Sequence, residues 1–476
     1  MLMYQLNSES DLPYYQQIIH ELIEAIQSGE LLPEERLPAE RKLAQLYGVN
    51  RSTVGRALDE LVSLGWLERQ QGSGTYISAT RIANRKSPQL PWKNLLARPI
   101  FVEDPYLAEL KTKRNEKDCI DLSSGDLPLS FIQNFNIPSL SWEQVLKMQA
   151  DLPESGEIHL RHALVNHLKN QYQLSLSAEE LLITSGSTQG MSLIFDTLLK
   201  PGDVVATENP SFLFSLPWIA SNQIELLGID MDNEGIIAEK LEQQILQRRI
   251  KLVYLNPDFQ NPTGRLMSLE RRQQILTICK KYQIPIVEDD AYGELNFNRP
   301  LPRLKSLADE QVIYLGSLSK IFSPHIKIGW VAAPKSLLSS IIDTKIQSER
   351  TTDLFSQIIA QNALSASDYL VKQTHLLHFL AQRQAEILHV FSEFSEDWQV
   401  QQTSGGLYLY CTWKHQKLHR KDWQIFLKQN LLVAPSFLYC NQCQSMRLNY
   451  AHLATYPLEE FKQRLAHCTS ILSAKR

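Results

Sequence analysis

A lysine follows a strand-like run near the middle of the chain, in a position that suits covalent chemistry. The string IYLGSLSK ends at Lys320, after an apolar run and two serines. Small neighbours at a strand end leave an amine open to react with an aldehyde, unlike a lysine on a solvated helix face. A single lysine is more often a surface residue, so this interpretation depends on further groups.

A carboxylate stands at the end of a second strand-like run, PIVEDDAY at residues 285–292. An aromatic ring that withdraws electrons through a protonated nitrogen needs such a group, and α/β sheets bind ligands at the carboxyl ends of their strands. Asp289 is the candidate. An acidic loop with no chemical role is the alternative interpretation of the same residues.

The string LLITSGSTQG offers a site for a phosphate. A predicted strand at 181–184 leads into Ser187 and Thr188, where an amphipathic helix begins. Backbone N–H groups at a helix start bind anions well when the neighbouring side chains are small. Many strand-to-helix turns look alike, so the turn is weak evidence by itself.

The elements that would position these groups form a regular pattern from Cys119 onward. Short apolar runs alternate there with longer amphipathic segments. This rhythm is typical of an α/β fold, with a mostly parallel sheet covered by helices. A chain of 476 residues is too long for one ordinary core, so more than one domain is expected.

The first 78 residues have a different texture, with short helical patterns and a Gly-rich turn. The predicted elements are helices at 15–26, 39–47 and 51–64 and strands at 66–69 and 75–78. Gly48, Val49 and Asn50 form the turn between the second and third helices. The pattern predicts a helix-turn-helix followed by a wing.

Polar side chains stand at the start of the third predicted helix, as reading of a DNA major groove requires. The candidate DNA-binding residues are Arg41, Arg51, Ser52, Thr53, Arg56 and Gly74. Residues 1–78 hold six Lys or Arg and eleven Asp or Glu, so the basic residues are concentrated locally. Any three-helix scaffold with exposed arginines would look similar.

An aperiodic segment at 79–118 is expected to link a domain at 1–78 to a large domain at 119–476. Residues 79–117 contain nine Lys or Arg and four Asp or Glu. We interpret the segment as a solvated tether. Nonspecific contacts with nucleic-acid phosphates are the alternative.

The remaining bulk properties exclude several classes of protein. No apolar run is long enough for a membrane span and no signal peptide is evident, so a cytoplasmic location without membrane contact is expected. The six cysteines make no disulfide framework. Cys440 and Cys443 form a lone CxxC, which zinc or redox chemistry could use, but no second pair stands at metal spacing and we predict no metal.

Two resemblances to known families accompany these patterns. The string LPAERKLAQLYGVNRSTVGRALDELVSLGWLERQQGSGTYI resembles the winged helix of the GntR transcription regulators, and in that family residues matching Arg41, Arg51, Thr53, Arg56 and Gly74 contact DNA. The motifs SGST, NPDFQNPTG, EDDAY, SLSK and MRLNY, in this order, resemble the fold-type I aminotransferases, which use pyridoxal 5′-phosphate.

Together the two parts resemble the MocR (GabR-like) regulators. The implied architecture is a winged helix-turn-helix plus a fold-type I transferase domain, with a mostly parallel central sheet and a smaller C-terminal α/β subdomain. By this resemblance, Lys320 would carry the cofactor as a Schiff base and Asp289 would pair with its pyridinium nitrogen. Asn261 and Tyr292 would bond the ring oxygen, and Phe212 would stack on the ring.

The resemblance also implies how the phosphate and an effector are held. Ser187, Thr188 and Ser317 would bind the phosphate, and Arg447 would grip the carboxylate of an amino acid. Lys327 stands where the family usually has a second phosphate-binding arginine, which keeps the charge but loses the two-pronged donor.

A second departure concerns the neighbouring subunit. The family's tyrosine that reaches the partner's cofactor is missing upstream of Gly156, where Asp151 or Leu152 stands. Both departures weigh against efficient transamination more than against cofactor binding.

The expected function is a homodimeric regulator that binds a double-stranded DNA operator and senses the cofactor, or an amine or amino acid effector. Imine exchange from Lys320 to the effector amine is the expected trigger. An active aminotransferase with an appended DNA-binding module is one alternative. A regulator that senses the cofactor alone is another.

Overall fold

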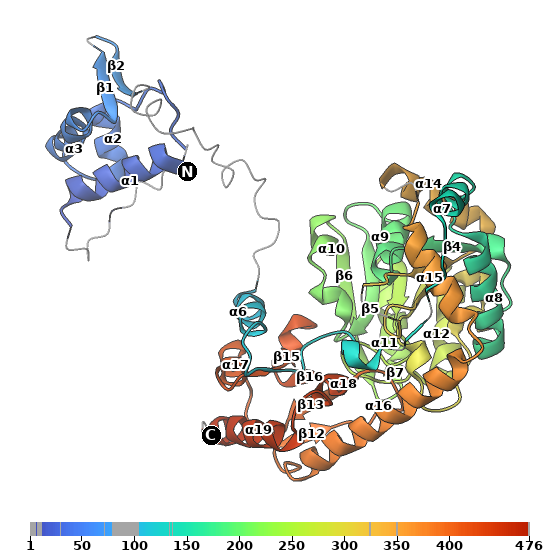
Figure 1. Cartoon of the computed structure of the whole chain (residues 1–476). Coiled ribbons are helices and arrows are strands. Elements are labelled where there is room, and N and C mark those ends of the chain that lie inside the picture. The colour runs from blue at the N-terminus through green and yellow to red at the C-terminus, as the bar shows by residue number, and fades with distance from the viewer. Residues whose placement is uncertain are drawn as a thin grey trace. The chain divides into compact units, whose positions relative to one another are not determined.

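The computed structural model describes residues 6, 12–28, 30–70, 72–78, 104–132, 134–135, 137–322, 325–348 and 351–474. The chain divides into two units, Met1–Val102 and Glu103–Arg476. Figure 1 shows the elements of both.

The first unit is a helix-turn-helix with a two-stranded wing, as the sequence predicts. Its elements are α1 (Tyr14–Ser28), α2 (Glu40–Tyr47), α3 (Arg51–Ser63), β1 (Leu67–Gln70) and β2 (Gly74–Ile77). Gly48 ends α2 with a φ of 67°, a left-handed conformation that suits glycine and lets the chain turn into α3. Leu22 of α1 and Val54 and Leu61 of α3 belong to one buried core, which fixes α3 on the other helices.

The second unit begins earlier than the sequence indicates. Helix α6 (Pro105–Lys113) is capped by Asp104, whose side chain accepts a hydrogen bond from Tyr106 N. Tyr106 and Leu110 are buried in the core of the second unit, and Tyr106 Oη donates to Val433 O over 3.0 Å. Residues 104–118, expected to be linker, therefore pack with the large unit. Two apolar anchors among many charged residues gave no helical periodicity; residues 79–103 lie outside the described range.

An eight-stranded sheet forms the centre of the second unit, in the order β4-β11-β10-β9-β8-β5-β6-β7. The strands are β4 (Leu181–Thr184), β5 (Val204–Asn209), β6 (Glu225–Asp232), β7 (Gly235–Ile236), β8 (Ile250–Leu255), β9 (Ile286–Asp290), β10 (Val312–Ser317) and β11 (Gly329–Ala332). Only β11 and β7 pair antiparallel with their neighbours in this sheet. The sheet is thus mostly parallel, as expected.

Helices cover both faces of this sheet because successive strand residues point to opposite sides. Leu182 joins one core cluster, with residues of α9 and α14, while Ile183 joins another, with residues of α8 and α16. The long helices are α7 (Trp142–Ala150), α8 (Ile158–Tyr172), α9 (Ser187–Leu198), α11 (Ala238–Gln247), α12 (Leu269–Lys281), α14 (Lys335–Ser348), α15 (Leu354–Leu364), α16 (Tyr369–Ser392) and α19 (Leu458–Ser473). Shorter helices are α10 (Pro217–Ser221), α13 (Leu304–Leu307), α17 (Gln424–Lys428) and α18 (Tyr450–Leu453).

A smaller C-terminal subdomain contains a four-stranded sheet in the order β12-β13-β16-β15. Its strands are β12 (Trp398–Val400), β13 (Tyr408–Trp413), β15 (Ala434–Pro435) and β16 (Ser445–Asn449). A short parallel pair, β3 (Ile120–Asp121) with β14 (Leu431–Leu432), ties the start of the unit to this subdomain. The loop after β3 therefore lies beside β16, which carries Arg447.

Candidate functional site

A cavity of about 270 Å³ opens where several parallel strands end and the C-terminal subdomain meets them. This volume is near the lower bound of about 300 Å³ for typical small-molecule sites. Eight of the ten residues predicted to bind cofactor or effector line it: Ser187, Thr188, Phe212, Asn261, Asp289, Tyr292, Lys320 and Arg447. The predicted residues are thus brought together from β4, β5, β8, β9, β10 and β16.

Lys320 follows β10 and points its amine at the loop after β3. Its Nζ donates to Gly125 O over 2.9 Å and to Asp126 Oδ1 over 2.7 Å. The side chains of Lys320 and Asp126 are 21% and 38% exposed. The amine is therefore held at the rim of the cavity by a carbonyl and a carboxylate that sequence reasoning did not single out.

Asp289 is buried near the end of β9, where its carboxyl group accepts hydrogen bonds from two directions. Tyr254 Oη donates to Oδ2, and Ala291 N donates to Oδ1 over 3.1 Å. Burial raises the pKa of Asp289, while the Tyr254 bond, the Ala291 bond and the charge of Lys320 oppose that rise. A protonated ring nitrogen facing Asp289 would further favour its ionised form.

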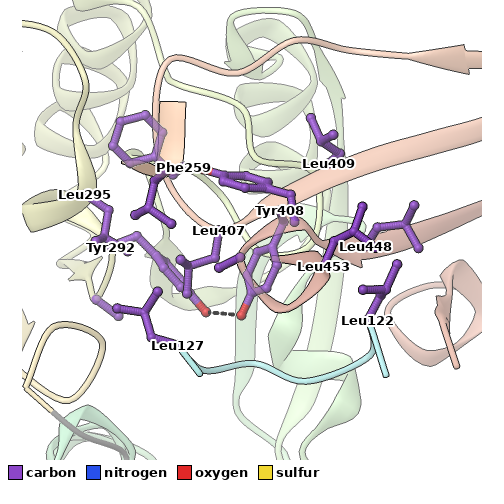
Figure 2. Packing of buried hydrophobic residues seen from close by; sticks show 14 of the residues in the cluster. Leu122, Leu127, Phe259, Tyr292, Leu295, Leu407, Tyr408, Leu409, Leu448 and Leu453 are labelled. Carbon is purple, nitrogen blue, oxygen red and sulfur yellow. Dashed lines mark hydrogen bonds between the residues drawn. The ribbon is translucent and has the colours of Figure 1, made fainter. Parts of the chain in front are cut away.

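Asn261, Tyr292 and Tyr408 form a connected polar row across the cavity. Asn261 Nδ2 donates to Tyr292 Oη over 3.2 Å, and the Tyr292 and Tyr408 hydroxyls lie 3.0 Å apart. Figure 2 shows this hydroxyl pair at the edge of the apolar cluster, with Leu127 and Leu407 close by. Burial, followed by the neighbouring Tyr408, raises the pKa of Tyr292, so its hydroxyl stays protonated and available as a donor.

Arg447 is buried on β16 and touches no carboxylate within the described residues. Its Nη1 donates to Asn261 Oδ1 over 2.9 Å and its Nη2 donates to Ser123 O over 2.7 Å. Its guanidinium lies 4.2 Å from the ring centre of Tyr408, and its Nε has no hydrogen-bond partner in the described part of the chain. A buried guanidinium with only neutral partners suits the carboxylate of a ligand.

The start of α9 forms a cradle for an anion. Gly186 takes a φ of 82° just before Ser187, and Gly329 packs beneath, where a Cβ would lie 2.6 Å from Ser187 N. Only a residue without a side chain fits there. The Ser319 hydroxyl, near Gly186, is buried and has no hydrogen-bond partner among the described residues. These groups match what a phosphate requires.

The two remaining predicted residues do not line the cavity. Ser317 Oγ donates to Ile328 O over 3.5 Å and accepts a bond from Ser319 N over 3.2 Å, so its hydroxyl serves the turn. Lys327 is exposed, and its Cβ lies 3.9 Å from where a Cβ of Gly186 would be. The Cβ of Lys327 therefore lies beside the cradle. For both Ser317 and Lys327, binding of the phosphate stays a prediction.

Sequence reasoning missed several cavity residues. Tyr254 lies near the end of β8 and Asn256 directly follows that strand. The string KLVYLNPDF places both at a strand end, which could have indicated them. Gly125, Tyr408 and Tyr439 come from the loop after β3 and from the C-terminal subdomain. No local pattern marks those three, because tertiary contacts alone bring them to the cavity.

In the first unit, the predicted DNA-contacting residues lie at the start of α3 and around it. Arg51 is 74% exposed on its side chain and pairs with Glu40 over 3.2 Å. Arg56 lies over the Tyr15 ring at 3.8 Å, so that side chain also has a packing role. Gly74 in the wing leaves room for Arg36, whose Nε would lie 2.9 Å from a Cβ there.

The remaining predicted positions also belong to this surface. Arg41 and Ser52 are exposed, and Thr53 is partly exposed. Their contacts with DNA stay predictions.

Two family models match the chain in succession. The gntR family of bacterial regulatory proteins matches residues 14–77, and aminotransferase class I and II matches residues 117–465. The chain belongs to the MocR type of GntR regulators. This regulator therefore joins a DNA-binding head to an aminotransferase domain of the pyridoxal-phosphate-dependent class, as the sequence analysis expected.

Relatives with curated descriptions support the same assignment. This regulator is 32% identical to the uncharacterized HTH-type transcriptional regulator YisV of Bacillus subtilis, over 96% of each chain. It is 34% identical to YdfD of the same organism over 75% of each chain. NorG of Staphylococcus aureus, also an HTH-type transcriptional regulator, is 25% identical over 87% of this chain and 95% of NorG.

Solved structures match the second unit. An archaeal alanine:glyoxylate aminotransferase has a TM-score of 0.70 and 24% identity, over 81% of this chain and all 100% of that one. A kynurenine aminotransferase of Pyrococcus horikoshii has a TM-score of 0.69 and 26% identity, over 79% of this chain and 96% of that one. The expected α/β fold is confirmed.

The residues of this regulator fit its implied cofactor. The unpartnered Ser319 hydroxyl, the glycine cradle at α9 and the buried Asp289 suit a phosphate and a protonated ring nitrogen. Among the described helices, none is both long and apolar enough to cross a membrane.

Proposed function

We propose that this regulator senses an amine or amino acid through pyridoxal phosphate held in the second unit, and that the sensing changes its affinity for a DNA operator. The observation that carries the proposal is the cavity in which three groups converge: a lysine amine, a buried carboxyl group and a buried arginine that contacts no described carboxylate. Its attachment to a DNA-binding head favours a sensor over a metabolic enzyme.

Each cavity residue would have a defined task. Lys320 would anchor the cofactor, and Asp289 would keep its ring nitrogen protonated. Ser187 and Thr188 would hold the phosphate at the start of α9, while Phe212 would cover the ring. When bound, pyridoxal phosphate supplies an aldehyde that accepts amines and a ring that withdraws electrons.

The selection of the effector would depend on β16 and the loop after β3. Arg447 would pair with an effector carboxylate, because its present partners are the neutral Ser123 O and Asn261 Oδ1. Asn261 and the Tyr292 hydroxyl would orient the cofactor ring through its oxygen. A ligand shifts the regulator only if it binds one arrangement of the protein better than the other.

A homodimer is part of this proposal, and an exposed apolar face supports it. Trp142 and Leu146 lie one turn apart on α7 and are 66% and 49% exposed. Phe355 on the neighbouring α15 is 51% exposed, while Val145 packs against Leu354 beneath them. An apolar face of this kind suits a second copy of the chain.

The test combines the visible absorbance of the bound cofactor with operator affinity. Titration of the loaded protein with amino acids should change the absorbance and, at the same concentrations, the Kd for operator DNA. Lys320→Ala should lose both responses. An effector that shifts DNA affinity while the absorbance stays constant would contradict the proposal.

An active aminotransferase is the second candidate. Arg447 favours it, because a buried guanidinium with neutral partners suits the carboxylate of an amino acid substrate. Steady turnover of an amino acid with a 2-oxoacid at about 1 per second or faster would support this alternative. If the regulator instead senses the cofactor alone, its affinity for DNA should depend on pyridoxal phosphate and should not change when any amine is added.

A further inference from the structure

A second hollow is lined by two segments that lie near cofactor-cavity residues in the sequence, one close to Asn261 and the other close to Tyr408. Its volume is about 490 Å³, and its walls come from the 264–266 loop, α16 and residues 401–404. Most of the lining side chains carry amides or hydroxyls. Arg265 is the one charged residue among the described residues that line it.

Arg265 is partly buried and forms no ion pair with a carboxylate of the described residues. Its Nε donates to Gln401 Oε1 over 3.1 Å. Within the described part of the chain, its two terminal nitrogens make no hydrogen bond or ion pair. Burial lowers the pKa of Arg265, while Tyr410 and Asp232 oppose that shift. Asp232 is itself engaged by Arg271 over 2.8 Å. A partly dehydrated guanidinium of this kind favours an added anion.

The neighbouring amides would complete an anion site. The side chains of Asn233, Asn298 and Gln402 are exposed in the hollow and form no hydrogen bond with other described residues. Each amide can donate two hydrogen bonds to an oxyanion. The described lining contains no carboxylate that would repel one.

We propose that this hollow binds a small oxyanion, a carboxylate or a phosphate, at a site separate from the cofactor cavity. The site adds a second ligand to the proposed function. Two chain segments connect the hollow to residues of the cofactor cavity, so a ligand in the hollow could alter the geometry of that cavity. Arg265 O accepts a bond from Gln260 N over 2.9 Å, which closes the loop that carries Asn261. On the opposite wall, Thr403 Oγ1 donates to Gly405 O over 2.9 Å, and Gly405 packs closely on Phe259.

The experiment uses the full chain loaded with pyridoxal phosphate, so that the cradle at α9 is already filled. Inorganic phosphate and succinate are titrated separately by calorimetry. At least one of them should bind, and Arg265→Gln should weaken that binding about tenfold or more. Gln402→Glu, at an exposed position that folding tolerates, should abolish it by placing a negative charge in the hollow.

Arg299→Gln is the matched control, because Arg299 is exposed next to Asn298 but does not line the hollow. Its affinity should equal that of the unchanged protein. Binding of phosphate alone assigns the site to phosphates, and binding of succinate alone assigns it to carboxylates. The proposal fails if neither probe binds at millimolar concentration, or if Arg265→Gln and Gln402→Glu bind as tightly as the unchanged protein. Equal weakening by Arg299→Gln would also overturn it.

Discussion

The amine of Lys320 forms an ion pair with Asp126, and the same amine is expected to attach to the cofactor. Asp126 and Gly125 hold Nζ in hydrogen-bond contact at the rim of the cavity. The same nitrogen cannot keep both ammonium bonds and join an aldehyde. Asp126 therefore competes with the cofactor for Lys320.

Asp126→Asn should accordingly raise the affinity for pyridoxal phosphate. The pair is partly exposed, so its removal is worth at most about 1 kcal/mol, which corresponds to roughly a fivefold lower Kd. Quenching of intrinsic fluorescence by the cofactor measures this Kd. Asp343→Asn, at an exposed position of α14, is the control and should leave the Kd unchanged. An unchanged or weaker affinity for Asp126→Asn would show that Asp126 does not compete.

Residues marked by strand ends could be predicted from the sequence, whereas residues delivered by distant loops could not. Asp289 and Lys320 follow apolar runs, and the sheet puts such ends side by side. Asp126 meets Lys320 across 194 positions of the chain. Only the pairing of β3 with β14 and the position of β16 bring that loop to the cavity.

At the scale of single elements, α3 contains a glycine at a position where neither backbone conformation nor packing requires one. Gly55 lies in the middle of α3, and a Cβ there would meet no atom within 4 Å. Glycine in a helix interior costs about 1 kcal/mol relative to alanine.

Gly55→Ala should therefore stabilise α3 by about 0.5–1 kcal/mol. Hydrogen–deuterium exchange of α3 in the full chain should slow by about twofold to fivefold. Gly190→Ala in α9 is the contrasting variant, since its Cβ would lie 2.5 Å from Leu315 Cδ1 and should destabilise the second unit. Faster exchange in α3 of Gly55→Ala would contradict the expectation.

Strand β5 carries a buried carboxyl group that links stability to pH. Burial raises the pKa of Glu208 to about 7, although Asn256 N donates to it over 2.7 Å. The folded state thus binds this proton more tightly than the unfolded state. The stability that Glu208 contributes is therefore greatest below about pH 4.5 and falls as the pH rises to about 7.

Glu208→Gln should remove this decline, because the amide keeps an acceptor for Asn256 N without a charge. At about pH 8 the variant should be more stable by on the order of 2 kcal/mol, with little difference at about pH 4.5. Urea unfolding at both pH values measures the effect. Glu225→Gln, on the exposed part of β6, should show no such difference. Equal stabilisation at both pH values would rule out the titration of Glu208 as the cause.

Apolar runs predicted the parallel strands well, since β4, β9 and β10 are buried along their whole length. The antiparallel course of β11 was not predictable, because a buried strand has the same pattern in either direction. Helix α6 escaped prediction for the opposite reason. Only Tyr106 and Leu110 anchor it, too few for a recognisable period.

At the scale of the whole molecule, the exposed face of α7 and α15 predicts the oligomeric state. Trp142→Glu places a charge at the centre of this face and should shift the protein from dimer to monomer. Sedimentation velocity at micromolar concentration measures the change. A monomer offers one winged helix instead of two, so operator affinity should fall about a hundredfold or more.

Leu246→Glu is a suitable control, because Leu246 is 70% exposed on α11, a helix that packs in a different core cluster from α7. It should leave the dimer intact. A Trp142→Glu protein that remains dimeric would place the interface elsewhere. A protein that is monomeric but binds the operator unchanged would separate dimerisation from DNA affinity.

The loop after β3 occupies hydrogen-bond donors of the cavity with its own backbone carbonyls. Arg447 binds its Ser123 carbonyl, Tyr408 and Lys320 bind its Gly125 carbonyl, and Asn449 binds the carbonyl of Asp126. If an effector carboxylate took the N–H that Nη2 of Arg447 donates to Ser123 O, the loop would lose one of these bonds, and the affinity for that effector would include the cost of losing it. α6 and β3 precede the loop and are the first described elements of the second unit. Binding of an effector at Arg447 and the packing of β3 would thus depend on one set of carbonyl bonds.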